Sequence, residues 1–99
     1  MKNEVKTFRL FVRSDEKSRQ IADKIRTLNE RTANPLVEAD DADLVIAIGG
    51  DGTFIDAVTS TKFSKKIIYT GIHTGTLGFL QDLCENDIFS LIHYINFEQ

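Results

Sequence analysis

The stretch D-L-V-I-A-I-G-G-D-G-T, residues 43 to 53, decides the fold of this chain and carries its chemistry. Leu44 to Ile48 are apolar without alternation, which is typical of a strand covered on both faces in a parallel sheet. Three glycines follow, and because glycine has no Cβ, they can take positive φ and let backbone N–H groups approach an anion closely. Thr53 is expected to open a helix from Phe54 to about Thr61, whose N-terminal amides and dipole favour the same anion. The stretch therefore predicts a phosphate site at the carboxyl end of a buried strand.

Asp51 is the charged residue of this glycine loop. A carboxylate repels a phosphate unless a metal ion or a proton-donating hydroxyl stands between them, and this conflict indicates a functional role. The alternative interpretation is that Asp51 caps the following helix by accepting a hydrogen bond from an N–H two or three residues on.

The composition fits one soluble globular domain, with 99 residues of which 41% are hydrophobic and 27% charged. A net charge of −3 with dispersed basic residues argues against a nucleic-acid or membrane-surface partner. Cys84 excludes an internal disulfide and makes no zinc-ligand spacing with His73 and His93. No protein-held metal is therefore expected, and the single cysteine favours a reducing cytoplasm. The sequence shows no apolar segment long enough for a signal peptide or membrane span.

Two predicted strand–helix units surround the glycine loop. The first is a strand over residues 6 to 13, followed by a helix that begins near Ser14-Asp15-Glu16. Ser14 is interpreted as the N-cap of that helix, with contact to a ligand as the alternative. Phe8, Leu10 and Val12 are expected on one face of the strand, and Ile21, Ala22, Ile25 and Leu28 on one face of the helix.

The remaining segments complete a parallel sheet. Leu36-Val37 is a candidate short strand, and Ile67 to Thr70 is another strand, followed by a second glycine loop, G-I-H-T-G-T-L-G-F, from Gly71 to Phe79. We expect the strand order second-first-third-fourth, with both glycine loops facing one crevice. The acidic cluster Asp40, Asp41 and Asp43 precedes the buried strand, so a solvated turn at the opposite end of the sheet is favoured over a metal site. An amphipathic helix is predicted over residues 87 to 97.

The two loops exclude some nucleotide-binding families and resemble others. G-x-x-x-x-G-K-[ST] is absent, and Gly50-x-Gly52 is followed by Ile55 where the dinucleotide fingerprint needs a third glycine. G-G-D-G-T resembles the signature shared by NAD kinases, by diacylglycerol and sphingosine kinases and, with serine for threonine, by 6-phosphofructokinases. The second loop is similar to the G-[IV]-N-x-G-x-L-G-F element of NAD kinases, whereas lipid kinases would show a proline-containing G-x-x-P-x-G-T-x-N-D. The opening L-F-V-R-S-D-E-K-S is similar to the first strand and turn of NAD kinases from Gram-positive bacteria.

The resemblance to NAD kinases implies a fold and a reaction. The fold is a Rossmann-like α/β parallel sheet with helices on both faces, similar to the nucleotide domain of 6-phosphofructokinases. Residues 1–99 would form the N-terminal domain, and a β-rich C-terminal domain would be absent from this chain. The implied reaction transfers the γ-phosphoryl group of ATP, or of polyphosphate in some members, to the 2′-hydroxyl of the adenosine ribose of NAD, with Mg²⁺ on the nucleotide.

The resemblance also assigns site residues and partners. Asp51 is the expected catalytic residue, and the expected nucleotide-binding residues are Gly49, Gly50, Asp51, Gly52, Thr53, Phe79 and Leu80. His73 stands where many members have asparagine, and Leu80 where several have tyrosine. A cytoplasmic homo-oligomer is expected for the full-length enzyme. The isolated chain is expected to be inactive, because the resemblance places an Asn-Glu or Asn-Asp pair that holds the acceptor ribose on the C-terminal domain.

Two other functions stay open on the sequence. A lipid kinase domain would need an apolar substrate groove and would phosphorylate diacylglycerol in detergent. A non-catalytic nucleotide-binding or assembly module would use the same crevice, and titration with NAD and ATP separates it from the kinases.

Overall fold

The computed structural model of the chain describes residues 5–62, 64–74 and 83–84. Its elements follow the order β1 (Thr7–Val12), α1 (Glu16–Glu30), β2 (Val37–Glu38), β3 (Leu44–Gly49), α2 (Asp51–Ser60), β4 (Ile68–His73) and β5 (Leu83–Cys84). The strands form one parallel sheet in the order β2-β1-β3-β4-β5. The predicted order of the first four strands is thus confirmed.

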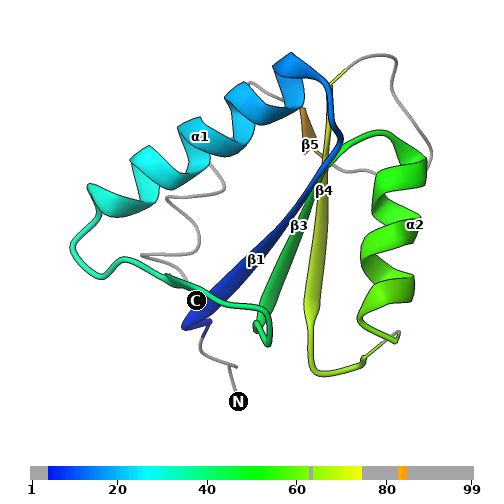
Figure 1. Cartoon of the computed structure of the whole chain (residues 1–99). Helices are drawn as coiled ribbons and strands as arrows, with labels where there is room; N and C mark the ends of the chain where they lie inside the picture. Colours follow the sequence, from blue (N-terminus) through cyan, green and yellow to red (C-terminus); the bar gives the residue numbers. More distant parts are fainter. Residues whose placement is uncertain (1–4, 63, 75–82, 85–99) are drawn as a thin grey trace.

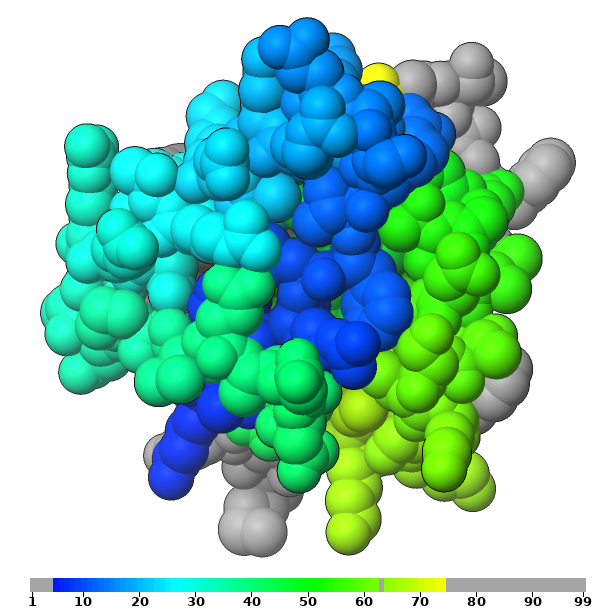
Figure 2. Space-filling view, in the orientation of Figure 1, coloured from blue at the N-terminus to red at the C-terminus, as the bar shows by residue number. Residues whose placement is uncertain are grey.

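The two helices cover opposite faces of the sheet (Figure 1). In Figure 2 the residues of β1, in blue, lie between those of α1, in cyan, and those of α2, in green. The direction of winding reverses between β1 and β3, because β1 leads through α1 to one edge of the sheet and β3 leads through α2 towards the other. Such a reversal leaves a crevice at the carboxyl ends of the two central strands.

Each sheet face has its own apolar cluster, which explains why β3 is apolar without alternation. All six β3 residues are buried. Ile46 and Ile48 pack with Ile21 and Ile25 of α1, while Val45 and Ala47 pack with Ala57 of α2. The predicted alternation of β1 is also confirmed, since Phe8, Leu10 and Val12 belong to the α1 face and Phe11 to the α2 face.

The amino ends of β1 and β3 are joined by Asp43. Its carboxylate accepts hydrogen bonds from the backbone N–H groups of Lys6 at 3.0 Å and Thr7 at 3.3 Å, and its own N–H donates to the Thr7 hydroxyl at 2.9 Å. The Lys6 and Thr7 amides, with the Thr7 hydroxyl, hold the pKa of Asp43 below its ordinary value. The predicted acidic turn therefore includes a carboxylate with a structural role.

Several predicted boundaries are wrong by a few residues. The helix of the glycine loop begins at Asp51 instead of Phe54, since glycine does not prevent a first helical turn after an extended Gly50. The short strand is Val37–Glu38 instead of Leu36-Val37. β4 continues through Gly71 to His73, because pairing with β3 extends that far, so Gly71 lies in a strand and not in a loop. The predicted helix at 87–97 lies outside the described residues. Within the described ranges, no helix is both long and apolar enough to cross a membrane.

Candidate functional site

The carboxyl ends of β1, β3 and β4 meet at one edge of the sheet. The Arg13 N–H, just after β1, donates to the Ile48 carbonyl at 2.9 Å. The Thr74 N–H, just after β4, donates to the Gly49 carbonyl at 3.0 Å, and Gly49 pairs with His73. The start of the second glycine loop therefore lies beside the first, as predicted.

Gly49 makes the sharp exit from β3. Its φ of +152° is a conformation that residues with a side chain rarely adopt. A Cβ at this position would stand 2.6 Å from Thr53 Oγ1 and 2.9 Å from Arg13 Cβ. Both backbone and packing therefore require glycine at position 49. Gly50 is different, because its φ is −129°, so the positive φ considered for the loop glycines applies to Gly49 and not to Gly50.

Asp51 occupies the first turn of α2 and does not cap it. The N-cap is Gly50, which has no side chain to accept a hydrogen bond, and the Phe54 N–H donates to the Gly50 carbonyl at 3.2 Å. The interpretation of Asp51 as an N-cap is therefore wrong. The first amides of a helix have no acceptors inside it, so Asp51, Gly52 and Thr53 present N–H groups and the positive end of the helix dipole at the crevice.

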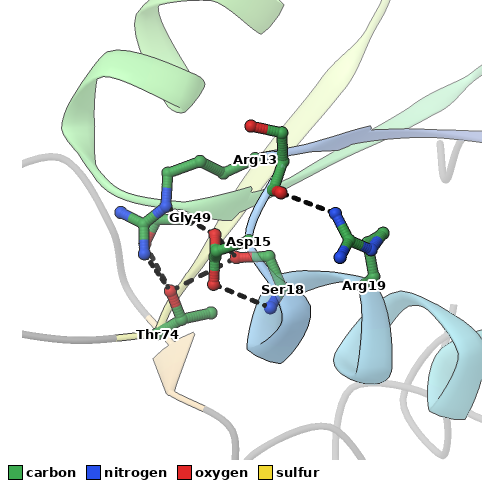
Figure 3. A network of polar contacts seen from close by, with 7 residues as sticks. Arg13, Asp15, Ser18, Arg19, Gly49 and Thr74 are labelled. Atoms are coloured by element: carbon green, nitrogen blue, oxygen red, sulfur yellow. Dashed lines mark hydrogen bonds and ion pairs between the residues drawn. The ribbon is translucent and has the colours of Figure 1, made fainter.

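A polar network links the ends of β1 and β4 to the start of α1 (Figure 3). Arg13 donates through Nε to Asp15 Oδ1 at 2.7 Å and through Nη2 to Thr74 Oγ1 at 2.9 Å. Asp15 caps α1 by accepting from the Ser18 N–H at 3.1 Å, and it also accepts from the Ser18 hydroxyl at 2.7 Å. Hydrogen bonds from Arg13 and then Ser18 hold the pKa of Asp15 far below its ordinary value, so this carboxylate is charged.

The sequence reasoning missed this network. Ser14 was expected to cap α1, but Asp15 does so, and the Ser14 carbonyl accepts from the Arg19 guanidinium instead. The strand that ends at Val12 is the signal that points to Arg13, since residues following parallel strands share one edge of the sheet. The link to Thr74 spans 61 positions in the sequence, so no local pattern reveals it.

Some of the predicted site residues are described by the structure and others lie outside the described residues. Gly49, Gly50, Asp51, Gly52 and Thr53 lie together at the end of β3 and in the first turn of α2. His73 ends β4 beside Gly49. Phe79 and Leu80 lie outside the described residues.

Comparison with known proteins identifies relatives over nearly the whole sequence. The family model described as "ATP-NAD kinase N-terminal domain" matches residues 2–98. The chain is 36% identical over 89 residues to the NAD kinase of Shouchella clausii, an alignment covering 89% of this chain and 33% of that protein. It is 33% identical over 85 residues to the NAD kinase of Lactococcus lactis, covering 84% of this chain and 31% of the relative. The chain thus spans about a third of the length of these relatives.

Proposed function

This chain belongs to the NAD kinase family, and from that premise we propose that it supplies the phosphate-binding loop and the reactive carboxylate for the transfer of the ATP γ-phosphoryl group to the adenosine ribose 2′-hydroxyl of NAD. The observation that carries the proposal is the placement of G-G-D-G-T. The loop lies at the carboxyl end of the central strand, beside the reversal of strand order, and leads directly into the first turn of α2.

The backbone of this loop suits an anion. Gly50, Gly52 and Thr53 bring amides to the crevice without large side chains in front of them, and the helix dipole favours negative charge there. A Cβ on Gly52 would meet no atom within 4 Å, so the space in front of this residue is open to a ligand. Phosphoryl transfer depends mainly on positioning and charge stabilisation, which such a loop provides.

Asp51 acts on the acceptor hydroxyl in this proposal. The ribose hydroxyl donates a hydrogen bond to the carboxylate, which orients the oxygen towards the γ-phosphorus and takes the proton late in the transfer. The hydroxyl then stands between carboxylate and phosphate, which resolves the repulsion noted from the sequence. Polyphosphate, the donor in some members, would present the same phosphoryl group to the loop.

We propose that Mg²⁺ arrives on the nucleotide. Among the described residues, no three His, Cys, Asp or Glu side chains gather as a metal-binding group. Mg²⁺ in phosphoryl-transfer sites commonly keeps several waters and binds substrate phosphates with one or two carboxylates. When bound, the ion would neutralise charge on the transferred phosphoryl group. Asp51 is the carboxylate that the G-G-D-G-T sequence contains.

In this proposal the acceptor ribose is held by a part of the kinase that corresponds to the unmatched two thirds of the relatives. Positioning two bound partners contributes up to about 7–11 kcal/mol to a reaction. We therefore expect the 99-residue chain alone to form little or no NADP, even with Asp51 intact.

The test is NADP formation from NAD, ATP and Mg²⁺ by the complete polypeptide that carries residues 1–99, with the S. clausii enzyme as the benchmark. Turnover with NAD and none with diacylglycerol supports the proposal. Nucleotide binding without turnover would instead indicate a non-catalytic module. The 99-residue chain is assayed in parallel, and turnover equal to that of the complete polypeptide would show that the acceptor site lies within residues 1–99.

A further inference from the structure

Arg13 is a cation at the carboxyl edge of the sheet. It follows β1 directly, at the reversal of strand order, and its backbone N–H continues the pairing with β3 through the Ile48 carbonyl. Its side chain is 47% exposed, so a ligand in the crevice can reach the guanidinium. Figure 3 shows this side chain beside Gly49 and Thr74.

The guanidinium is held in place by two of its three nitrogens. Nε binds Asp15 and Nη2 binds Thr74, while Nη1 lies 3.4 Å from the position that a Cβ on Gly50 would take. A planar guanidinium fixed in this way loses little further freedom when it binds a phosphate through its remaining nitrogen. The absence of a side chain at Gly50 leaves that nitrogen next to the open backbone of the loop.

We propose that Arg13 binds the diphosphate group of an adenine nucleotide through Nη1, beside the amides of the G-G-D-G-T loop. This inference deepens the proposed function, since it takes the diphosphate of that reaction's substrates as the ligand. Nη1 carries two N–H donors in the plane of the guanidinium, and both can donate to phosphate oxygens. Through Nη2 the same residue contacts Thr74, just after β4.

The test uses the 99-residue chain and three probes without Mg²⁺: inorganic pyrophosphate, ADP and NAD. Binding is followed by NMR titration of the ¹⁵N-labelled chain, including the Nε–H signal of Arg13. We expect Arg13→Gln to weaken pyrophosphate binding about 10-fold, as loss of a hydrogen bond to a charged group does, and Arg13→Lys to recover part of it. The ADP and NAD titrations show whether the bound diphosphate is that of the donor or of the acceptor, according to which loses affinity in Arg13→Gln.

Two controls separate direct binding from a structural role. Arg9 lies within β1, lines the hollow at the amino end of the sheet and places its guanidinium carbon 4.4 Å from the centroid of the Phe11 ring. Arg9→Gln therefore removes the same charge from the same segment without removing a contact to the G-G-D-G-T loop. Thr74→Val removes the Thr74 contact but keeps the guanidinium. We expect Arg9→Gln to bind pyrophosphate like the original chain, and Thr74→Val to weaken binding less than Arg13→Gln.

Three results would overturn the inference: no pyrophosphate binding by the original chain at millimolar concentration, equal loss in Arg9→Gln and Arg13→Gln, or equal loss in Thr74→Val and Arg13→Gln. Either of the first two results would show that Arg13 does not bind the phosphate. The third would show that Arg13 acts only as a structural support. Failure of the kinase proposal is detected by a different measurement, the assay of NADP formation. The two failures can be distinguished because pyrophosphate can bind to a chain that has no kinase activity.

Discussion

The two ends of the sheet carry similar residue types and differ in what those residues do. At the amino end, Asp40, Asp41 and Asp43 line a hollow of about 490 Å³ together with Arg9 and Lys66. At the carboxyl end, Asp51 lies among glycines, and Arg13 lies against Gly49 and Gly50. Carboxylates beside a cavity are typical of the amino end. The backbone geometry that suits an anion, glycines followed by a helix N-terminus, is found at the carboxyl end.

Chain direction explains the difference. In a parallel sheet each helix begins near the carboxyl end of the preceding strand, so its positive end faces the crevice there. The helices end at the opposite side, where their exposed carbonyls favour cations, and Lys62 and Lys66 follow α2. At the amino end the Asp43 carboxylate therefore accepts from backbone amides that hold β1 and β3 together, whereas at the carboxyl end Asp51 lies in the first turn of α2.

The largest effect is expected from Asp51→Asn. The amide keeps the size of the side chain but cannot take the proton, so turnover in the complete polypeptide should fall about 10²- to 10⁴-fold with little change in NAD binding. Asp41→Asn is the matched control, an exposed aspartate at the amino end, and should leave turnover unchanged. The measurement is the rate of NADP formation at saturating NAD and ATP. Near-normal turnover in Asp51→Asn would remove the chemical distinction between the two ends.

The next effect concerns stability. Gly49→Ala places a Cβ against Thr53 and Arg13 at a positive φ, and such strain costs about 1–3 kcal/mol of unfolding free energy. We expect this loss in urea denaturation of the 99-residue chain. A stability equal to that of the original chain would show that the exit from β3 tolerates a side chain.

Gly52→Ala is the partner of that experiment within the same loop. Gly52 is exposed inside the first turn of α2, so alanine should raise stability by about 0.5–1 kcal/mol. If a phosphate approaches the Gly52 amide, the added methyl group should weaken pyrophosphate binding in the same variant. Gain of stability together with loss of binding would mark position 52 as glycine for the ligand, and position 49 as glycine for the fold.

Much of this comparison was predictable from the sequence. The unbroken apolar run of β3 and the glycines after it predicted a doubly covered strand that ends in a loop, and the strand–helix units with glycines at their ends predicted the strand order. The helix start was misplaced because Asp51 and Gly52 are weak helix formers, and the N-terminus of α2 forms in spite of them. The Arg13–Thr74 contact could not be predicted, since it depends on the distance between two strand ends that are paired with a third.

At the amino end we expect an effect on stability alone. Asp43→Ala removes the acceptor for the Lys6 and Thr7 amides, and hydrogen bonds of this kind contribute about 1 kcal/mol. Urea denaturation should show this loss, while the affinity for pyrophosphate stays unchanged. A change in affinity without a change in stability would mean that the amino end belongs to the ligand site.

The smallest effect is the response to acid, and it distinguishes the two ends once more. The pKa values of Asp15 and Asp43 are lowered in the folded chain, by Arg13 above all for the first and by the Lys6 amide above all for the second. A lowered pKa means that the unfolded chain takes up protons first, so this stabilisation is complete above the ordinary carboxyl pKa of about 3.9 and is lost progressively as the pH falls below it.

Asn is a good N-cap, so Asp15→Asn keeps the cap of α1 and removes mainly the ion pair with Arg13. We expect the difference in unfolding free energy between pH 7 and pH 3 to shrink in both Asp15→Asn and Asp43→Asn, and more in Asp15→Asn because its pKa is lowered further. Equal acid sensitivity in Asp15→Asn and the original chain would show that the Arg13–Asp15 pair contributes no measurable stability to the fold.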